Sequence, residues 1–320
     1  MVFSKGHIFA ASGALFASTM SVLAKLAYSH GIIPATVVTW RASLALLTLS
    51  LALIARRRSL PKIALADLPF FLLFGSVGIA VNYAAYFYAL SYTTVATAVV
   101  LLYTYPTIVA ILSRAFLRER LGAVKILSLG LTFSGCVALT KAYDPTIFTP
   151  NILGISLAVL ASLAVAVYFV LGKRALRTYE TWTVLFYALA VGSATLILAS
   201  PLSFLTLDFS VEVFAILLTL AWLSTLIAYS LFTLALSHID ASTTTIIATL
   251  EPVAAILLAF VVLGESVDMV QVAGIALVIL GIIILQVRRP QAGWKGFRAS
   301  TNTRIETKDY HPSQPSAQAV

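Results

Sequence analysis

Long apolar stretches alternate with short polar breaks along most of the chain. Each stretch holds about 20 residues, the length that an α-helix needs to cross ~30 Å of hydrocarbon. In hydrocarbon, each backbone N–H and C=O group must be hydrogen-bonded within its own segment, so we predict a helix for every stretch. The ten predicted helices cover residues 6–28, 33–55, 67–90, 94–116, 121–140, 151–172, 181–200, 212–236, 241–263 and 267–287.

The apolar pattern ends near Arg288. Beyond it the chain is rich in Ser, Thr, Pro, Gln and charged residues, a composition that cannot bury a core. We therefore predict a disordered tail over residues 290–320.

Composition places the ten helices in a lipid bilayer. The mean hydropathy is +1.00, and 60% of residues are hydrophobic and 10% charged, against about 45–50% and about 25% in soluble domains. The net charge of +9 does not indicate a nucleic-acid partner, because the basic residues lie between apolar segments and in the tail. The only cysteine, Cys136, excludes an internal disulfide.

The basic residues predict the orientation of the chain. Almost all of the 21 lysine and arginine residues fall in the N-terminus, in alternate loops and in the tail. Basic residues near the ends of membrane helices are retained in the cytoplasm. We therefore predict a multi-pass protein of the plasma membrane with both termini in the cytoplasm.

The sequence repeats itself. Residues 83–139 align with residues 229–285 at a constant offset of 146 without a gap. The first helix of each half matches more weakly at an offset of 148. Scarce residue types coincide, which random apolar sequence would not produce, as in Tyr83/Tyr229, Pro106/Pro252, Glu119/Glu265 and Gly135/Gly281.

The repeat divides the chain into residues 1–143 and residues 144–289, with five predicted helices in each. Because five is odd, the second repeat must cross the membrane upside down relative to the first. Inverted repeats that meet at a midplane site are typical of secondary transporters that work by alternating access.

The repeated motifs make the chain resemble the drug/metabolite transporter superfamily with paired EamA-type domains. The resemblance covers about residues 6–287 and rests on the segments 102–106, 117–120, 250–252 and 263–265, together with Thr39 to Ala45. It implies helices arranged around a central cavity, with the fifth and tenth more peripheral. It also implies a small-molecule substrate such as an amino acid or a related metabolite, and export rather than uptake.

Glu251 is the strongest candidate for a functional side chain. A carboxylate in the middle of an apolar helix costs a few kcal/mol unless it is paired or protonated. It either binds a substrate amine or exchanges protons as the coupling ion, or it satisfies backbone groups freed by the neighbouring Pro252.

Arg41 lies about nine residues into its helix, roughly 13 Å from the predicted outer end. It either binds a substrate carboxylate in the cavity or extends toward the outer interface. Pro106 and Pro252 each remove a backbone hydrogen bond near the middle of a helix, so they are predicted kinks or hinges.

Polar and aromatic residues on two helix faces complete the predicted cavity. One face carries Asn82, Tyr83 and Tyr86, and the other carries Trp222, Thr225 and Tyr229, while Tyr105 precedes Pro106. From helix direction alone, we expect Tyr83 and Tyr229 on opposite sides of the site, as two gate residues. Glu119 and Glu265 are expected to stabilise the N-termini of the helices that follow them.

Other functional classes are not indicated. The chain has no Gly-rich phosphate loop and no His-Glu-x-x-His zinc motif, and no nucleophile elbow. We therefore predict no enzymatic activity, no cofactor and no metal. The predicted function is a secondary transporter that exports amino acids or related solutes. The alternatives are a carrier of anionic phosphorylated or nucleotide-linked metabolites, which needs Arg41 and Lys25 in the cavity, and a membrane receptor or scaffold.

Overall fold

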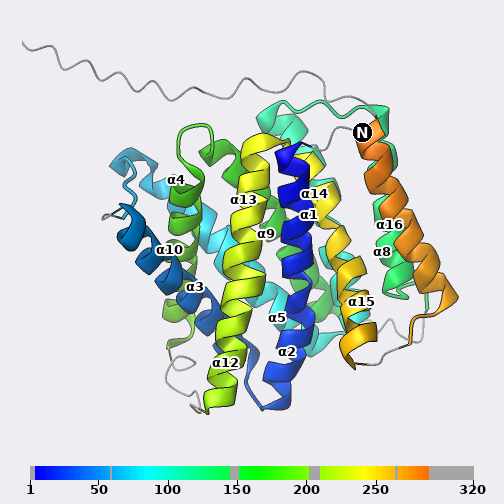
Figure 1. Cartoon of the computed structure of the whole chain (residues 1–320), viewed down its shortest axis with the longest axis horizontal. Coiled ribbons are helices and arrows are strands. Elements are labelled where there is room, and N and C mark those ends of the chain that lie inside the picture. Colours follow the sequence, from blue (N-terminus) through cyan, green and yellow to red (C-terminus); the bar gives the residue numbers. More distant parts are fainter. Residues whose placement is uncertain (1–3, 58–59, 145–150, 202–209, 264–265, 288–320) are drawn as a thin grey trace, which may run out of the picture.

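The computed structural model describes residues 4–57, 60–144, 151–201, 210–263 and 266–287. The predicted disordered tail at 290–320 and Glu265 lie outside these ranges. The described residues are almost entirely helical (Figure 1). The α-helices of the first repeat are α1 (Lys5–Ala17), α2 (Thr19–Ser29), α3 (Pro34–Arg57), α4 (Leu68–Gly75), α5 (Asn82–Tyr92), α6 (Val95–Leu102), α7 (Tyr105–Leu112) and α8 (Ala123–Leu139). Those of the second are α9 (Ile152–Ala175), α10 (Thr181–Ala199), α12 (Val211–Thr219), α13 (Ala228–His238), α14 (Ala241–Ala248), α15 (Leu250–Leu263) and α16 (Met269–Val287).

These helices confirm the predicted membrane fold. Within the described ranges, nine continuous helical stretches are long and apolar enough to cross a membrane, and α8 is a shorter apolar helix of 17 residues. Large apolar side chains cover the outside of the bundle, such as Leu51, Ile111 and Val261, which are 60%, 60% and 76% exposed. Such a surface is stable against lipid and not against water.

The two helices that contain Pro106 and Pro252 are each broken near their middle. In the first, α6 ends at Leu102 and α7 begins at Tyr105; in the second, α14 ends at Ala248 and α15 begins at Leu250. A proline lacks the N–H group that would bond to the preceding turn, so the helix is interrupted there. The breaks occur at matching positions of the repeat, because Leu102 and Ala248 are 146 residues apart.

Two π-helical turns also match across the repeat. They are η2 (Ser76–Val81), between α4 and α5, and η4 (Leu220–Ile227), between α12 and α13. A π-turn has i→i+5 hydrogen bonds, is rare, and is frequent at functional sites. Both turns lead directly into the helices that carry Tyr83 and Tyr229.

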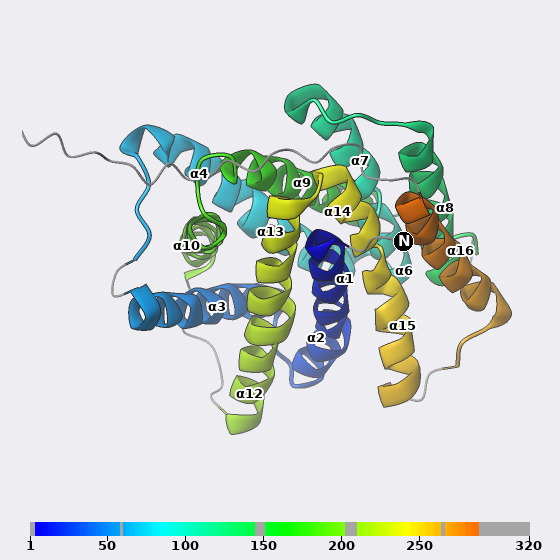
Figure 2. The same cartoon turned by 45° about the horizontal axis from the view of Figure 1, so that its top comes forward.

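The two repeats interlock rather than stand apart. The first helix of each repeat packs along the third helix of the other, so that α1 contacts α13 and α9 contacts α5. The last helices, α8 and α16, pack against each other along their length. They lie together at one edge of the bundle in both views (Figures 1 and 2), which agrees with the peripheral position expected for the fifth and tenth helices.

Glycines allow α8 and α16 to approach closely. A Cβ added to Gly135 would lie 2.8 Å from the Gly274 carbonyl oxygen and 2.6 Å from Cγ2 of Val278. We expect Gly135→Ala to force the helices apart and to destabilise the protein by about 1–3 kcal/mol. Gly130 is the matched control, because nothing lies within 4 Å of its added Cβ. Thermal unfolding in detergent should show a lower midpoint for Gly135→Ala than for the wild type, and an unlowered midpoint for Gly130→Ala. Equal midpoints of the two variants would contradict this packing.

Candidate functional site

A cavity of about 70 Å³ lies in the centre of the bundle, between the two repeats. It is bounded by residues next to the broken helices and the π-helical turns. As shaped here, it has room for a few water molecules or a small polar group, so a larger solute requires it to widen. Among the residues that line it are Met20, Arg41, Asn82, Tyr83, Tyr86, Tyr105, Tyr168, Phe169, Ser224, Tyr229, Phe232 and Glu251.

Glu251 lies in the first turn of α15, directly after the helix break. The free backbone N–H groups and the dipole of a helix N-terminus stabilise a carboxylate there. The break in the helix therefore places an acidic group at the cavity wall, at the N-terminal end of a helix.

Arg41 extends from α3 into the bundle and is 1% exposed. Its Nε donates a hydrogen bond to Oγ1 of Thr225 at 3.0 Å, and Nη1 donates to Sδ of Met20 at 3.1 Å. The guanidinium carbon lies 4.2 Å from the ring centroid of Tyr83, in cation–π geometry. No Asp or Glu of the described chain lies within ion-pair distance of Arg41. Arg41 is thus a buried cation whose hydrogen-bond acceptors are neutral and which has no carboxylate of the described residues within ion-pair distance.

Tyr83 and Tyr229 contact each other at the centre of the site. Their ring centroids are 5.9 Å apart at an interplanar angle of 84°, and Nδ2 of Asn82 donates to the Tyr229 hydroxyl at 3.3 Å. The expectation that they lie on opposite sides was wrong. Two residues at matching repeat positions touch when both lie on the pseudo-two-fold axis, and helix direction alone does not reveal that.

Trp222 and Thr225 lie differently from the other predicted cavity residues. Trp222 is 45% exposed, and its indole Nε1 donates to Oγ1 of Thr48 at 3.0 Å, away from the cavity. Thr225 is fully buried and accepts the hydrogen bond from Arg41, but it does not line the cavity. Both residues belong to η4. The predicted common face with Tyr229 assumed α-helical spacing, whereas i→i+5 winding rotates these side chains away from it.

Stacked aromatic side chains form a further part of the cavity wall. Tyr105 and Phe169 stack with ring centroids 5.8 Å apart and nearly parallel planes, and Tyr168 and Phe232 pack edge-on against Phe169. The Tyr168 hydroxyl is hydrogen-bonded to Oγ1 of Thr233 at 3.0 Å. This wall offers apolar ring faces to a ligand.

The sequence analysis missed Met20, Tyr168 and Phe169. Met20 and Tyr168 occupy matching positions of the repeat, since they are 148 residues apart, the offset that relates the first helix of each repeat. Both line the cavity. Neither was a predicted cavity residue, so the repeat would not have added them; it would have added Phe232, the counterpart of Tyr86.

An all-helical membrane fold of two inverted repeats around a central polar cavity defines a class of membrane transporter. The family model of the EamA-like transporter family matches the chain twice, at residues 4–141 and 152–287. The chain belongs to this family. The sequence prediction of paired EamA-type domains is thereby confirmed, and the protein is a membrane transporter.

Several relatives carry the same assignment as transporters. A transporter of Archaeoglobus fulgidus is 29% identical over 63% of this chain and 70% of its own. The transporter YyaM of Bacillus subtilis is 26% identical over 78% and 83%, and a transporter of Clostridium kluyveri is 24% identical over 88% and 92%. One solved crystal structure superposes with a TM-score of 0.74 at 20% identity, over 88% of this chain and 97% of that one. That likeness concerns the fold.

Proposed function

We propose that this transporter carries a small solute with both a carboxylate and an amine, an amino acid or a close relative, by alternating access. The supporting observation is that Arg41 and Glu251 line the same cavity without forming an ion pair with each other. A buried cation without a counter-ion is costly. A substrate carboxylate supplies that counter-ion through two parallel hydrogen bonds to the guanidinium.

Glu251 provides the other half of the recognition. A carboxylate at the cavity wall accepts either a proton or the ammonium group of the substrate, but not both at once. Release of the substrate on one side and uptake of a proton there exchanges the two across the membrane. The proton is therefore the proposed coupling ion, and Arg41, Tyr86 and Tyr105 line the same cavity as the exchanging carboxylate.

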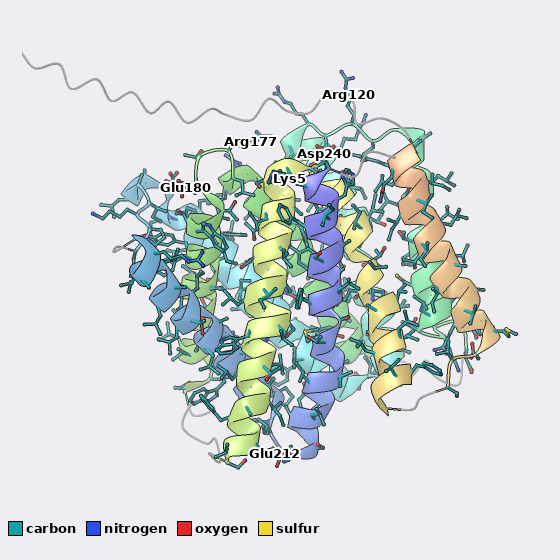
Figure 3. All side chains as sticks on the ribbon, viewed as in Figure 1. Lys5, Arg120, Arg177, Glu180, Glu212 and Asp240 are labelled. Carbon is teal, nitrogen blue, oxygen red and sulfur yellow. The ribbon has the colours of Figure 1, made fainter. Side chains whose placement is uncertain are left out.

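The direction of transport follows from the proposed orientation. Lys5, Arg120 and Arg177 lie at the end of the bundle where α1 begins, and Glu212 lies at the opposite end (Figure 3). Basic residues on one face favour a cytoplasmic location for that face. With both termini in the cytoplasm of a plasma membrane, proton entry would drive export of the solute.

An anionic phosphorylated or nucleotide-linked substrate is less favoured. Such a ligand carries two or more negative charges and would meet Glu251 next to the single cation found among the described cavity residues, Arg41. Like charges in a cavity of low dielectric constant repel strongly.

The test is transport by the purified protein in proteoliposomes. We expect counterflow of one or more amino acids from a panel of metabolites, and accumulation of the solute against its gradient in the compartment that has the lower pH. Neutral amide analogues and phosphorylated metabolites should not be transported. Flux of phosphorylated solutes alone, or of none of the panel, would contradict the proposal.

A further inference from the structure

A polar cluster joins the two repeats at the end of the bundle where α1 begins. Glu119 and Lys125, from the first repeat, contact Asp240 and Ser242, from the second. We call these four residues the inter-repeat latch. Asp240 lies at the same end of the bundle as Lys5 (Figure 3).

Glu119 caps a helix of the other repeat. Its side chain is 6% exposed, and its Oε1 accepts a hydrogen bond from the Ala241 backbone N–H at 2.7 Å. Its Oε2 accepts bonds from the backbone N–H and from Oγ of Ser242, at 3.2 and 2.5 Å. Asp240, at the N-cap position of α14, makes no side-chain cap of its own. The expectation that Glu119 stabilises the helix that follows it in sequence was wrong, because it stabilises α14.

Lys125 completes the cluster with a cation. Its Nζ lies 2.8 Å from Oδ2 of Asp240, 2.9 Å from Oγ of Ser242 and 3.8 Å from Oε2 of Glu119. The Asp240 side chain is 51% exposed, whereas Glu119 is buried, and hydrogen bonds to an ionised group are about twice as strong as neutral ones. Several of them therefore have to break together if the two repeats separate at this end.

The latch acts on the two broken helices. α7 and the π-helical turn η3 (Ser113–Leu117) lead from the break before Pro106 to Glu119. α14 leads from the latch to the break before Glu251. The latch thus connects two half-helices, α7 and α14, which contact each other. One terminus of each half-helix lies toward the latch, and the other lies at the break beside the cavity.

Among the described residues, the repeat counterparts of Asp240, Ser242 and Lys125 at the opposite end of the bundle carry no charge. At an offset of 146 residues, Asp240, Ser242 and Lys125 correspond to Thr94, Ala96 and Gln271. Thr94 caps its own helix through the Thr97 N–H, and Nε2 of Gln271 donates to the Leu139 carbonyl. Thr94, Ala96 and Gln271 therefore form neither an ion pair nor a hydrogen bond with one another.

We propose that the inter-repeat latch is a gate that keeps this end of the cavity closed and favours the state open to the opposite side. The proposal rests on the alternating-access function proposed above. Opening this end requires α7 and α14 to swing apart at their breaks, with loss of the Glu119 cap. Because these contacts must break before this end opens, loss of one of them shifts the equilibrium toward the state that is open at this end.

Labelling of a single cysteine in the cavity tests the gate without any substrate. Ser224→Cys in a Cys136→Ala background places one thiol at the cavity wall. A membrane-impermeant maleimide is then applied from either side of oriented vesicles. With Glu119→Gln or Ser242→Ala added, labelling from the latched end should rise by about tenfold, the shift expected from loss of one charge-assisted hydrogen bond. Labelling from the opposite side should fall.

Asp268→Asn is the matched control. The ion pair between Lys141 and Asp268, at 2.6 Å, also joins the two repeats, but it lies beside the peripheral helices α8 and α16. The hydrogen-bonded Lys141 ammonium lowers the pKa of Asp268, so the pair is charged near pH 7. Its loss should leave both labelling rates unchanged. Unchanged labelling in the latch variants, or an equal rise from both sides, would overturn the proposal.

A reversible cross-link gives the second test. In the same Cys136→Ala background, Glu119→Cys combined with Ser242→Cys should form a disulfide on oxidation, stop counterflow, and regain it on reduction. Undiminished flux in the fully cross-linked protein would overturn the gate. If the reduced protein carries no solute of the panel, the proposed function fails, while the labelling result still decides the gate.

Discussion

Glu251→Gln is expected to abolish accumulation of substrate driven by a pH gradient. In a one-to-one exchange, a gradient of one pH unit sustains about a tenfold substrate gradient. Glutamine cannot carry the exchanged proton, so the ratio should fall to about one. Substrate exchange without a gradient should persist, because the amide still accepts a hydrogen bond from the substrate ammonium. Accumulation and counterflow in proteoliposomes measure the two separately.

Glu212→Gln serves as the control for charge removal. Its side chain is 73% exposed at the opposite end of the bundle and contacts His30 at 3.5 Å, so accumulation should stay at the wild-type level. Thermal unfolding in detergent checks that Glu251→Gln remains folded. Uphill accumulation by a folded Glu251→Gln protein at the wild-type ratio would exclude Glu251 as the coupling group.

Arg41→Gln is expected to weaken binding of carboxylate-bearing substrates by about 30-fold or more. Removing one partner of a buried, hydrogen-bonded charge pair costs about 2–5 kcal/mol. Neutral amide analogues should gain relative to the acids, because they do not need the cation. Competition assays with matched acid and amide pairs measure this change in preference.

Two further substitutions sharpen the Arg41 experiment. Arg41→Lys keeps the charge but loses the planar fork, so we expect an intermediate affinity. Arg114→Gln removes an exposed arginine from η3 and should leave the affinity unchanged. An unaltered acid-to-amide preference in Arg41→Gln would mean that Arg41 holds Thr225 and Tyr83 in place and does not touch the substrate.

The sequence was sufficient to predict the fold because membrane helices are specified by simple local rules. Apolar length predicted the spans, and the shared Pro106/Pro252 spacing predicted the repeat. The helix breaks also lie next to Pro106 and Pro252, as the sequence predicted. These features depend on hydrogen bonding and hydrophobicity within one segment, which the residue order displays directly.

The geometry of the site was less predictable. Arg41, Glu251 and most of the predicted polar and aromatic residues line one cavity, whereas Trp222 does not. The reason is the π-helical winding of η4, for which the sequence offers no simple signal. The contact between Tyr83 and Tyr229 and the capping of α14 by Glu119 join distant segments. Such contacts depend on how the two repeats dock, and helix periodicity carries no information on docking.

The position that holds Glu251 has Tyr105 as its counterpart, 146 residues earlier. A cavity on the axis between two identical halves would carry every charge twice, and two carboxylates facing each other would repel. Joining both halves in one chain allows each side of the axis to differ. Because only one side holds the carboxylate, the cavity has a direction of its own, and a dipolar solute has a single preferred orientation within it.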